Sequence, residues 1–200
     1  MVSKSSDATV TAPLETPWQK WRLLAVVSVV AVVLDQLTKL WAVRSLRPIG
    51  IKTVLRGYFD LRYSLNTGAA WSFLADSDPT FRRWFFLSAT IVAMVFIATM
   101  YRRALASQRA FRWALALLFG GAIGNFIDRL RSGQVIDFIS LHLRDRFHWA
   151  TFNVADIAIT VGLLLLAFDM LTSRRKKAVE PTPAVTSASA DRVRRRRRKK

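Results

Sequence analysis

Four long stretches of the chain are almost entirely apolar, and polar or charged segments separate them. These stretches are residues 21–43, 84–101, 111–130 and 153–172. A helix needs roughly 20 apolar residues to cross the hydrocarbon core of a bilayer, so each stretch predicts one transmembrane helix. The pattern therefore predicts an all-α membrane protein with four crossings, and an even number of crossings places both termini on one side of the membrane.

The segments between the first and second helices and between the third and fourth helices have a different pattern. Residues 58–66 (YFDLRYSLN) alternate between apolar and polar side chains, which predicts a half-buried strand on the membrane surface. Residues 132–152 are too polar to span a membrane and are rich in strand-forming residues. Residues 69–76 (AAWSFLAD) predict a short interfacial helix. We therefore expect a small amount of β structure and one short helix outside the membrane.

The distribution of basic residues predicts the orientation. The loop between the second and third helices carries four arginines and lies on the same side as both termini. Lysine and arginine near helix ends favour the cytoplasmic side, so we expect both termini in the cytoplasm and the β-rich segments outside. Arg82 and Arg83 favour the opposite orientation, but they are outnumbered.

The formal net charge of +18 is concentrated in the C-terminal part of the chain. Residues 174–200 contain twelve Lys or Arg residues against Glu180 and Asp191, and the segment between the two basic clusters is rich in Pro, Ser, Thr and Ala. This composition predicts a disordered cytoplasmic tail. Beside a membrane helix the favoured partner is anionic lipid rather than nucleic acid, and a functionless solvated extension is the third reading. The predicted organisation is a lead-in over 1–20, a membrane domain over 21–173 and this tail.

Several kinds of chemistry are excluded or poorly supported. The chain has no cysteine, which rules out a thiol nucleophile, a disulfide and a thiolate metal site. His142 and His148 do not have a recognised metal-ligand spacing, and no serine lies in a nucleophile-elbow motif. We therefore expect neither a metal nor an organic cofactor, and carboxylates are the remaining candidates for catalysis.

Polar residues of three predicted helices fall at one level, in the half of the membrane away from the termini. They are Asp35 and Lys39 of the first helix, Asn125, Asp128 and Arg129 of the third, and Asn153 and Asp156 of the fourth. Ionisable groups at such depth cost a few kcal/mol and usually serve a function. Structural alternatives remain open: an Asp35–Lys39 ion pair, a polar clasp between helices, and Asn153 as the N-cap of the fourth helix.

Two further features bear on this polar level. Gly120 and Gly124 are four residues apart, a spacing that lets helix backbones approach closely. Asp137, in the β-rich segment, adds a carboxylate at the level of Asp156. Two aspartates held close in a low-dielectric site cannot both ionise and titrate as a unit. Such a pair can supply both a general base and a general acid, as in aspartic proteolysis.

Four blocks of the sequence resemble, in order and spacing, the signature of the bacterial lipoprotein signal peptidases (signal peptidase II). They are LDQLTK (34–39), NTGAAWSFL (66–74), GGAIGNFIDRLRSGQVIDF (120–138) and FNVADIAITVG (152–162). The resemblance implies an intramembrane aspartyl endopeptidase with four helices, an outer-face β-cradle and a short interfacial helix. It would cleave diacylglyceryl-modified prolipoproteins just before the modified cysteine, in the bacterial inner membrane, and we expect it to act as a monomer.

The resemblance also assigns residues. Asp137 and Asp156 match the catalytic dyad of the family. The other signature polar residues match Asn66, Asn125, Asp128, Arg129, Asn153, Asp35 and Lys39, which would orient the dyad, bind substrate or hold the helices. Trp71 and Ile157 depart from the usual pattern, where phenylalanine and serine are common. The competing hypothesis is a non-enzymatic membrane protein whose polar level is a helix clasp or a lipid or ion site.

Overall fold

The computed structural model describes residues 16–68, 77–144 and 146–179. Within them are four helices long and apolar enough to cross a membrane: α1 (Pro17–Ser45), α2 (Pro79–Arg103), α3 (Arg109–Ser132) and α4 (Val154–Val179). They confirm the four predicted membrane helices. The helix predicted over 69–76, with Trp71, lies outside the described residues.

Two compact units divide the chain, Met1–Leu166 and Ala167–Lys200. The described part of the second unit is the C-terminal end of α4, where the hydroxyl of Thr172 donates to the carbonyl of Phe168 at 2.9 Å. Helix α4 continues to Val179, so it extends through residues 173–179, past the predicted helix end at residue 172. This segment has no Gly or Pro to stop the helix.

Local sequence signals define the helix ends. Thr16 and Gln19 form a capping box at the start of α1, followed by Pro17 in the first turn. Asp78 caps α2 by accepting hydrogen bonds from the backbone N–H groups of Thr80 and Phe81, both at 2.9 Å. After α3, Gly133 adopts a left-handed conformation with φ of 76°, which glycine tolerates best.

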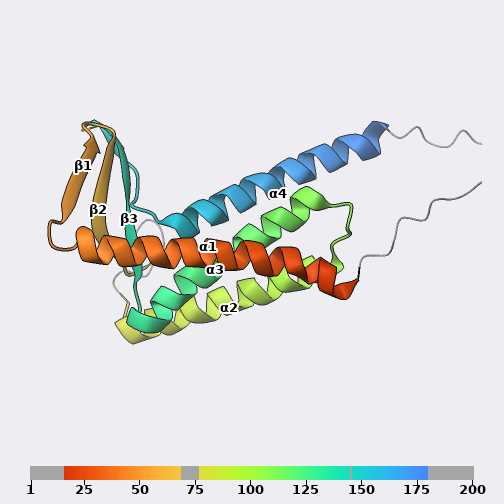
Figure 1. The fold of residues 1–200 in the computed structure, drawn as a ribbon, viewed down its shortest axis with the longest axis horizontal. Coiled ribbons are helices and arrows are strands. Elements are labelled where there is room, and N and C mark those ends of the chain that lie inside the picture. Colours follow the sequence, from red (N-terminus) through yellow and green to blue (C-terminus); the bar gives the residue numbers. More distant parts are fainter. Residues whose placement is uncertain (1–15, 69–76, 145, 180–200) are drawn as a thin grey trace, which may run out of the picture. The chain divides into compact units, whose positions relative to one another are not determined.

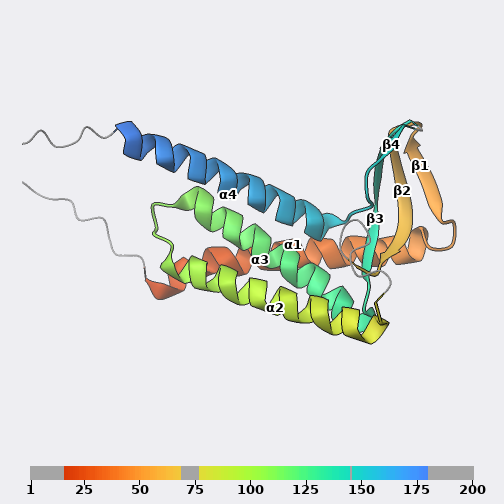
Figure 2. The same ribbon diagram turned by 180° about the vertical axis from the view of Figure 1, so that it is seen from behind.

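Helix α3 packs against both α1 and α2, and the three helices run side by side in both views (Figures 1 and 2). Small residues make this possible. A Cβ atom on Gly120 would lie 2.9 Å from the Cβ of Ala31 in α1, and one on Gly124 would lie 2.6 Å from a carboxylate oxygen of Asp35. The predicted close approach at these two glycines is therefore confirmed.

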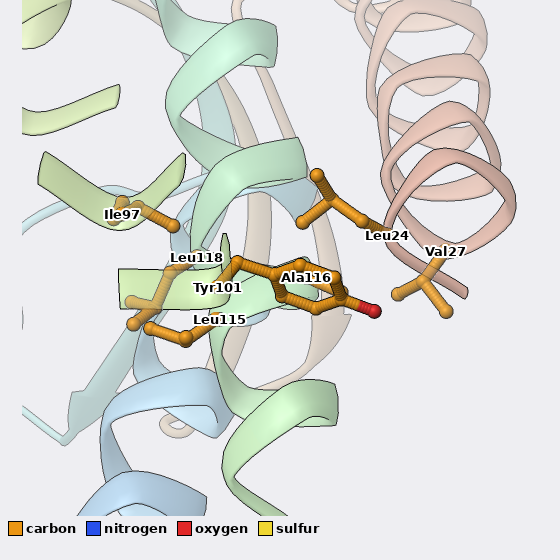
Figure 3. Close-up of a cluster of buried hydrophobic side chains, with 7 residues drawn as sticks. All are labelled: Leu24, Val27, Ile97, Tyr101, Leu115, Ala116 and Leu118. Atoms are coloured by element: carbon orange, nitrogen blue, oxygen red, sulfur yellow. The ribbon is translucent and has the colours of Figure 1, made fainter. Parts of the chain in front are cut away.

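An apolar cluster joins the three helices near the start of α1. It consists of Leu24, Val27, Ile97, Tyr101, Leu115, Ala116 and Leu118 (Figure 3). Figure 3 shows the ring of Tyr101 extending from α2 across α3 toward Leu24 and Val27 of α1. Its hydroxyl donates to the carbonyl of Lys20 at 2.9 Å, and the buried Arg112 donates to the same carbonyl at 3.0 Å.

A four-stranded antiparallel sheet lies at the other end of these helices, beside the last turns of α1 and next to the start of α4 (Figures 1 and 2). Its order is β1 (Ile51–Leu55), β2 (Phe59–Asn66), β3 (Val135–Leu143) and β4 (Phe147–His148). The strand predicted over 58–66 and the β-rich character of 132–152 are confirmed. Strand β1 was not predicted; it pairs with β2 through a turn in which Gly57 has φ of 85°.

The pairing of β2 with β3 positions two of the predicted site residues. Asn66 lies opposite Val135, and Ser64 lies opposite Asp137. Phe138, buried next to Asp137, packs against Ala42 and Leu46 near the end of α1. The sheet is thereby held to α1, and its third strand carries Asp137 toward the helix ends.

Candidate active site

All nine sequence-predicted site residues lie at the sheet end of the helices. They come from five elements and one connecting residue: Asp35 and Lys39 (α1), Asn66 (β2), Asn125, Asp128 and Arg129 (α3), Asp137 (β3), Asn153, and Asp156 (α4). Eight of them form one network of hydrogen bonds and ion pairs, and Arg129 lies beside it.

Asn153 connects the two candidate catalytic carboxylates. It immediately precedes α4 and is completely buried. Its side-chain N–H donates to Asp137 Oδ1 at 2.7 Å, while its backbone N–H donates to Asp156 Oδ2 at 3.1 Å. Its side-chain oxygen accepts from the backbone N–H of Asp156 at 3.0 Å. The N-cap interpretation of Asn153 is therefore confirmed, and the same side chain also contacts Asp137.

Two other asparagines complete the hydrogen bonding of these carboxylates. Asn66 donates to Asp137 Oδ2 at 3.1 Å, and Asn125 donates to Asp156 Oδ1 at 2.8 Å. All four carboxylate oxygens thus accept a hydrogen bond from an amide. Within the described residues, neither Asp137 nor Asp156 forms an ion pair, so amide dipoles rather than full charges hold both side chains.

The environment of Asp137 favours its neutral form. Its side chain is 1% exposed. The pKa of Asp137 is raised from 3.8 to about 7, first because burial disfavours the charged carboxylate and second because the Asp156 carboxylate is close. Hydrogen bonds from Asn66 and Asn153 and the charge of Lys39 oppose this rise. A carboxyl with a pKa near 7 can exchange its proton in the neutral range, as acid–base catalysis requires.

A buried ion cluster lies next to the two carboxylates. The Nζ of Lys39, 2% exposed, is 2.8 Å from Asp35 Oδ2 and 2.7 Å from Asp128 Oδ2. It also donates to Asn125 Oδ1 at 3.0 Å. An ammonium group has three donors, and each one has an acceptor here. The predicted Asp35–Lys39 ion pair is confirmed, and Asp128 extends it to α3 as the clasp interpretation expected.

The two carboxylates of the cluster also hold the backbone beside Asp137 and Asp156. Asp35 Oδ1 accepts from the N–H of Ala155 at 2.9 Å, and Asp128 Oδ2 accepts from the N–H of Ile136 at 3.2 Å. Each of these N–H groups belongs to the residue immediately before a candidate catalytic aspartate. The clasp therefore also positions those aspartates.

Arg129 lies close to the network without bonding to it directly. Its guanidinium stacks over the ring of Phe86 in α2, 5.2 Å from the ring centroid. It is near enough to Asp156, Asp137 and Asp128 to interact electrostatically with them. Arg129 thus joins α2 to α3, as the clasp interpretation proposed, and adds positive potential near the carboxylates.

Asp156 also faces an open groove of about 440 Å³. The wall of this groove is otherwise largely apolar and is formed by Leu141, Trp149, Phe152, Ile157 and Val161, with Thr160. Ile157, the departure from the usual family pattern, is 41% exposed in this wall. An apolar groove with one carboxylate suits a chain segment that approaches from a lipid environment.

One network residue was not singled out from the sequence. Gln36 donates to Asp35, Asp128 and the carbonyl of Gly124, and it stands within the block LDQLTK. Its position next to Asp35 was the sequence feature that could have identified it as a site residue. In the described residues there is no group of three or more His, Cys, Asp or Glu side chains arranged to hold a metal ion.

Comparisons with known proteins identify the family of the chain. The model of a family described as signal peptidase (SPase) II matches residues 27–172. Lipoprotein signal peptidases of Geobacter metallireducens and Geobacter sulfurreducens are each 43% identical to the chain over 158 residues. The alignments cover 79% of this chain and 96% and 97% of those proteins.

Solved structures show the same fold. A bacterial membrane enzyme determined by the in meso method at 2.3 Å resolution superposes with a TM-score of 0.67 and 27% identity, covering 80% of this chain and 93% of that one. A second such structure, at 1.9 Å resolution, gives a TM-score of 0.62 and 28% identity. The chain therefore belongs to the signal peptidase II family.

Proposed function

We propose that this protein is an aspartic endopeptidase that removes the signal peptide from diacylglyceryl-modified prolipoproteins, cleaving just before the modified cysteine. Membership of the family makes the chain a protease of prolipoprotein signal peptides. The aspartic mechanism rests on one observation: the carboxylates of buried Asp137 and half-buried Asp156 share Asn153 as a hydrogen-bond donor, and Asp156 faces an open groove.

The proposed chemistry uses the pair as one acid and one base. One of the two aspartates is ionised and takes a proton from a water molecule. The oxygen of that water then bonds to the scissile carbonyl carbon. The other is protonated and donates a hydrogen bond to the developing oxyanion. The C–N bond then breaks, and the amine of the modified cysteine leaves with a proton. The pKa of Asp137 near 7 supports a pair that holds one proton at neutral pH.

The surrounding residues have supporting roles in this proposal. Asn66, Asn125 and Asn153 hold the two carboxylates by their amide groups. Asp35, Lys39 and Asp128 hold Asn125 and the adjacent backbone. Arg129 contributes positive potential. None of these roles involves a metal or organic cofactor.

We further propose that the substrate reaches Asp156 laterally from the bilayer. The groove at Asp156 continues along α4 through Ile157 and Val161, and its wall is formed by residues such as Trp149. A signal helix and its lipid chains can lie against apolar side chains without leaving a lipid environment. The scissile amide would then be held at the sheet end of the helices.

The decisive experiment is cleavage of a purified, lipid-modified prolipoprotein by the wild type, Asp137→Asn and Asp156→Asn. Both variants should fold and lose at least about a hundredfold in rate, because each removes a proton-transfer group. Asp60→Asn is the matched control, since this β2 carboxylate pairs with His142 outside the network. The new N-terminus, identified by mass spectrometry, locates the cut. Full activity of either dyad variant would refute the dyad.

The alternative of a non-enzymatic membrane protein is distinguished by the same assay. The ion cluster around Lys39 fits a helix clasp, since it pairs opposite charges from α1 and α3. Asp137 and Asp156 do not fit a helix clasp, because two neighbouring carboxylates held by amides do not attract each other. A folded wild type without activity on the lipid-modified substrate would favour the clasp alone.

The proposed location is the bacterial inner membrane, with both termini in the cytoplasm, the site near the outer face and the protein acting as a monomer. The basic loop between α2 and α3 supports this orientation. Reporter fusions in residues 104–108 should report a cytoplasmic location, and an external one would reverse the orientation. The basic residues of 180–200 would bind anionic lipid; liposome binding that is unchanged on deleting them would refute that role.

A further inference from the structure

Gln36 occupies a junction between α1 and α3 at the edge of the ion cluster. Its side-chain N–H group donates to Asp128 Oδ1 at 3.1 Å, to Asp35 Oδ2 at 3.2 Å and to the carbonyl of Gly124 at 3.3 Å. Its side-chain oxygen accepts from Arg131 Nη1 at 3.0 Å. One carboxamide therefore contacts both carboxylates that surround Lys39.

The contacts fix the orientation of this carboxamide. Three acceptors surround its nitrogen, and a guanidinium donor faces its oxygen. A flipped amide would place its oxygen against two carboxylates and its nitrogen against an arginine, losing every one of these bonds. A glutamine is thus the residue type that satisfies both sides of the junction with no added charge.

A continuous chain of short contacts leads from Gln36 to the proposed dyad. Gln36 contacts Asp35 and Asp128, and both of these pair with Lys39. Lys39 donates to the side-chain oxygen of Asn125, which leaves the amide nitrogen of Asn125 to donate to Asp156. The side-chain N–H of Asn153 donates to the same oxygen at 3.2 Å, so Lys39 and Asn153 together fix which way the Asn125 amide points.

We propose that Gln36 is a positioning residue for the reaction: it holds Asp35 and Asp128 around Lys39, and through Lys39 and Asn125 it sets the geometry of Asp156. This inference rests on the proposed function. It assigns Gln36 no contact with substrate. Gln36 acts by keeping two like charges at fixed places on either side of one ammonium group.

The charged groups around this junction come from every element packed there. Helix α1 contributes Asp35 and Lys39, and α3 contributes Asp128, Arg129 and Arg131, while Asp137 and Asp156 follow on β3 and α4. Asp35 and Asp128 already outnumber Lys39 in the buried cluster. A carboxylate at position 36 would add a further negative charge and weaken the positive field of Lys39 at the dyad.

The test compares Gln36→Met, which keeps the length and removes the polar atoms, with Gln36→Glu, which keeps the shape and adds a charge. In the cleavage assay Gln36→Met should lower kcat by about tenfold to a hundredfold with KM changed less than threefold, because small displacements of catalytic groups cost rate. Gln36→Glu should move the acidic limb of the kcat profile upward by about half a pH unit or more.

Thr38→Val is the matched control. The hydroxyl of Thr38 bonds to carbonyls of its own helix, at Leu34 and Asp35, so the control disturbs the same turn of α1 without touching α3. Its kcat and pH profile should match the wild type. If Gln36→Met does not fold, Gln36→Asn replaces it, since the shorter amide cannot keep all three contacts.

The outcomes separate this inference from the proposed function. A wild type that cleaves and an inactive Asp137→Asn establish the dyad independently of Gln36. Folded Gln36 variants with kcat within twofold of wild type and an unshifted pH profile would then overturn the positioning role. A loss of kcat equal to that of Thr38→Val would overturn it as well, because the effect would belong to the helix turn.

Discussion

Asn153 and Asp156 cap each other at the start of α4. The backbone N–H of Asn153 donates to Asp156 Oδ2 at 3.1 Å, and the backbone N–H of Asp156 donates to Asn153 Oδ1 at 3.0 Å. This is the geometry of a capping box. Because the same Asn153 side chain donates to Asp137, the residue that caps α4 also links the two carboxylates.

Substitution of Asn153 should separate capping from the link to Asp137. Asn153→Ser keeps a capping oxygen for the Asp156 N–H but removes the amide that donates to Asp137, so we expect near-normal thermal stability with strongly reduced cleavage. Asn153→Ala loses both and should in addition lower the free energy of unfolding by about 1 to 2 kcal/mol. Thermal unfolding in detergent and the cleavage assay measure the two effects. Equal activity of Asn153→Ser and wild type would contradict the prediction.

The raised pKa of Asp137 predicts a pH-dependent stability. The folded protein holds this proton up to about pH 7, whereas the unfolded chain releases it near 3.8. The stabilisation is therefore complete below about pH 4 and is lost as the pH rises through 7. Asp137→Asn removes this loss, so its stability relative to wild type should increase between pH 4 and pH 8 by on the order of 2 to 4 kcal/mol.

Thermal melts of wild type and Asp137→Asn at the two pH values provide the measurement. The hydrogen bond that asparagine cannot accept lowers the variant's stability equally at both pH values, so the pH-dependent difference isolates the ionisation. Asp78→Asn is the control, because asparagine caps a helix as well as aspartate does. Parallel pH dependence of Asp137→Asn and wild type would show that Asp137 does not titrate between these limits.

At two glycines of α3, helix propensity and packing predict opposite effects of a Gly→Ala substitution on stability. Gly→Ala in a helix interior normally stabilises by about 1 kcal/mol. A Cβ on Gly121 would lie 2.5 Å from the carbonyl oxygen of Ala155, and one on Gly124 would lie 2.6 Å from Asp35 Oδ2. We expect each variant to be destabilised by about 1 to 3 kcal/mol. Stabilisation of either variant would show that α1 and α4 have room to move.

Tyr101→Phe tests the other end of the helices. It removes the hydroxyl that donates to Lys20 and accepts from Arg112 at 3.4 Å, while the ring stays in the cluster of Figure 3. We expect a loss of about 1 kcal/mol in the free energy of unfolding with kcat unchanged. A large fall in kcat would couple this cluster to the active site, which no contact described above predicts.

The sequence predicted the elements that have a strong local pattern. Apolar length identified the four helices, and strict alternation identified β2 at Phe59–Asn66. It missed β1, where Ile51–Leu55 has no alternating burial because every residue is exposed. The end of α4 was also placed too early, because a basic composition does not itself stop a helix.

For the site, depth in the membrane indicated which residues share a level but could not reveal their pairings. Lys39 could be expected to pair with Asp35, four residues away, because both lie on one helix face. That Asp128 completes the cluster, and that Gln36 joins both carboxylates, depends on how α1 meets α3 at Gly120 and Gly124. The bond from Asn153 to Asp137 needed the pairing of Phe152 with Ile139 of β3, which no local pattern encodes.

The order of the ion cluster along the chain has a consequence for biosynthesis. Lys39 and Asp35 lie on the same helix, but Asn125 follows Lys39 by 86 residues and Ala155 follows Asp35 by 120. If α1 inserts as the chain is synthesised, it enters the bilayer before these later partners exist. An unpaired aspartate in a membrane helix costs about 3 kcal/mol at insertion. The Asp35–Lys39 pair lets the nascent helix carry a neutral charge pair into lipid, and the later helices then recruit that pair to the active site.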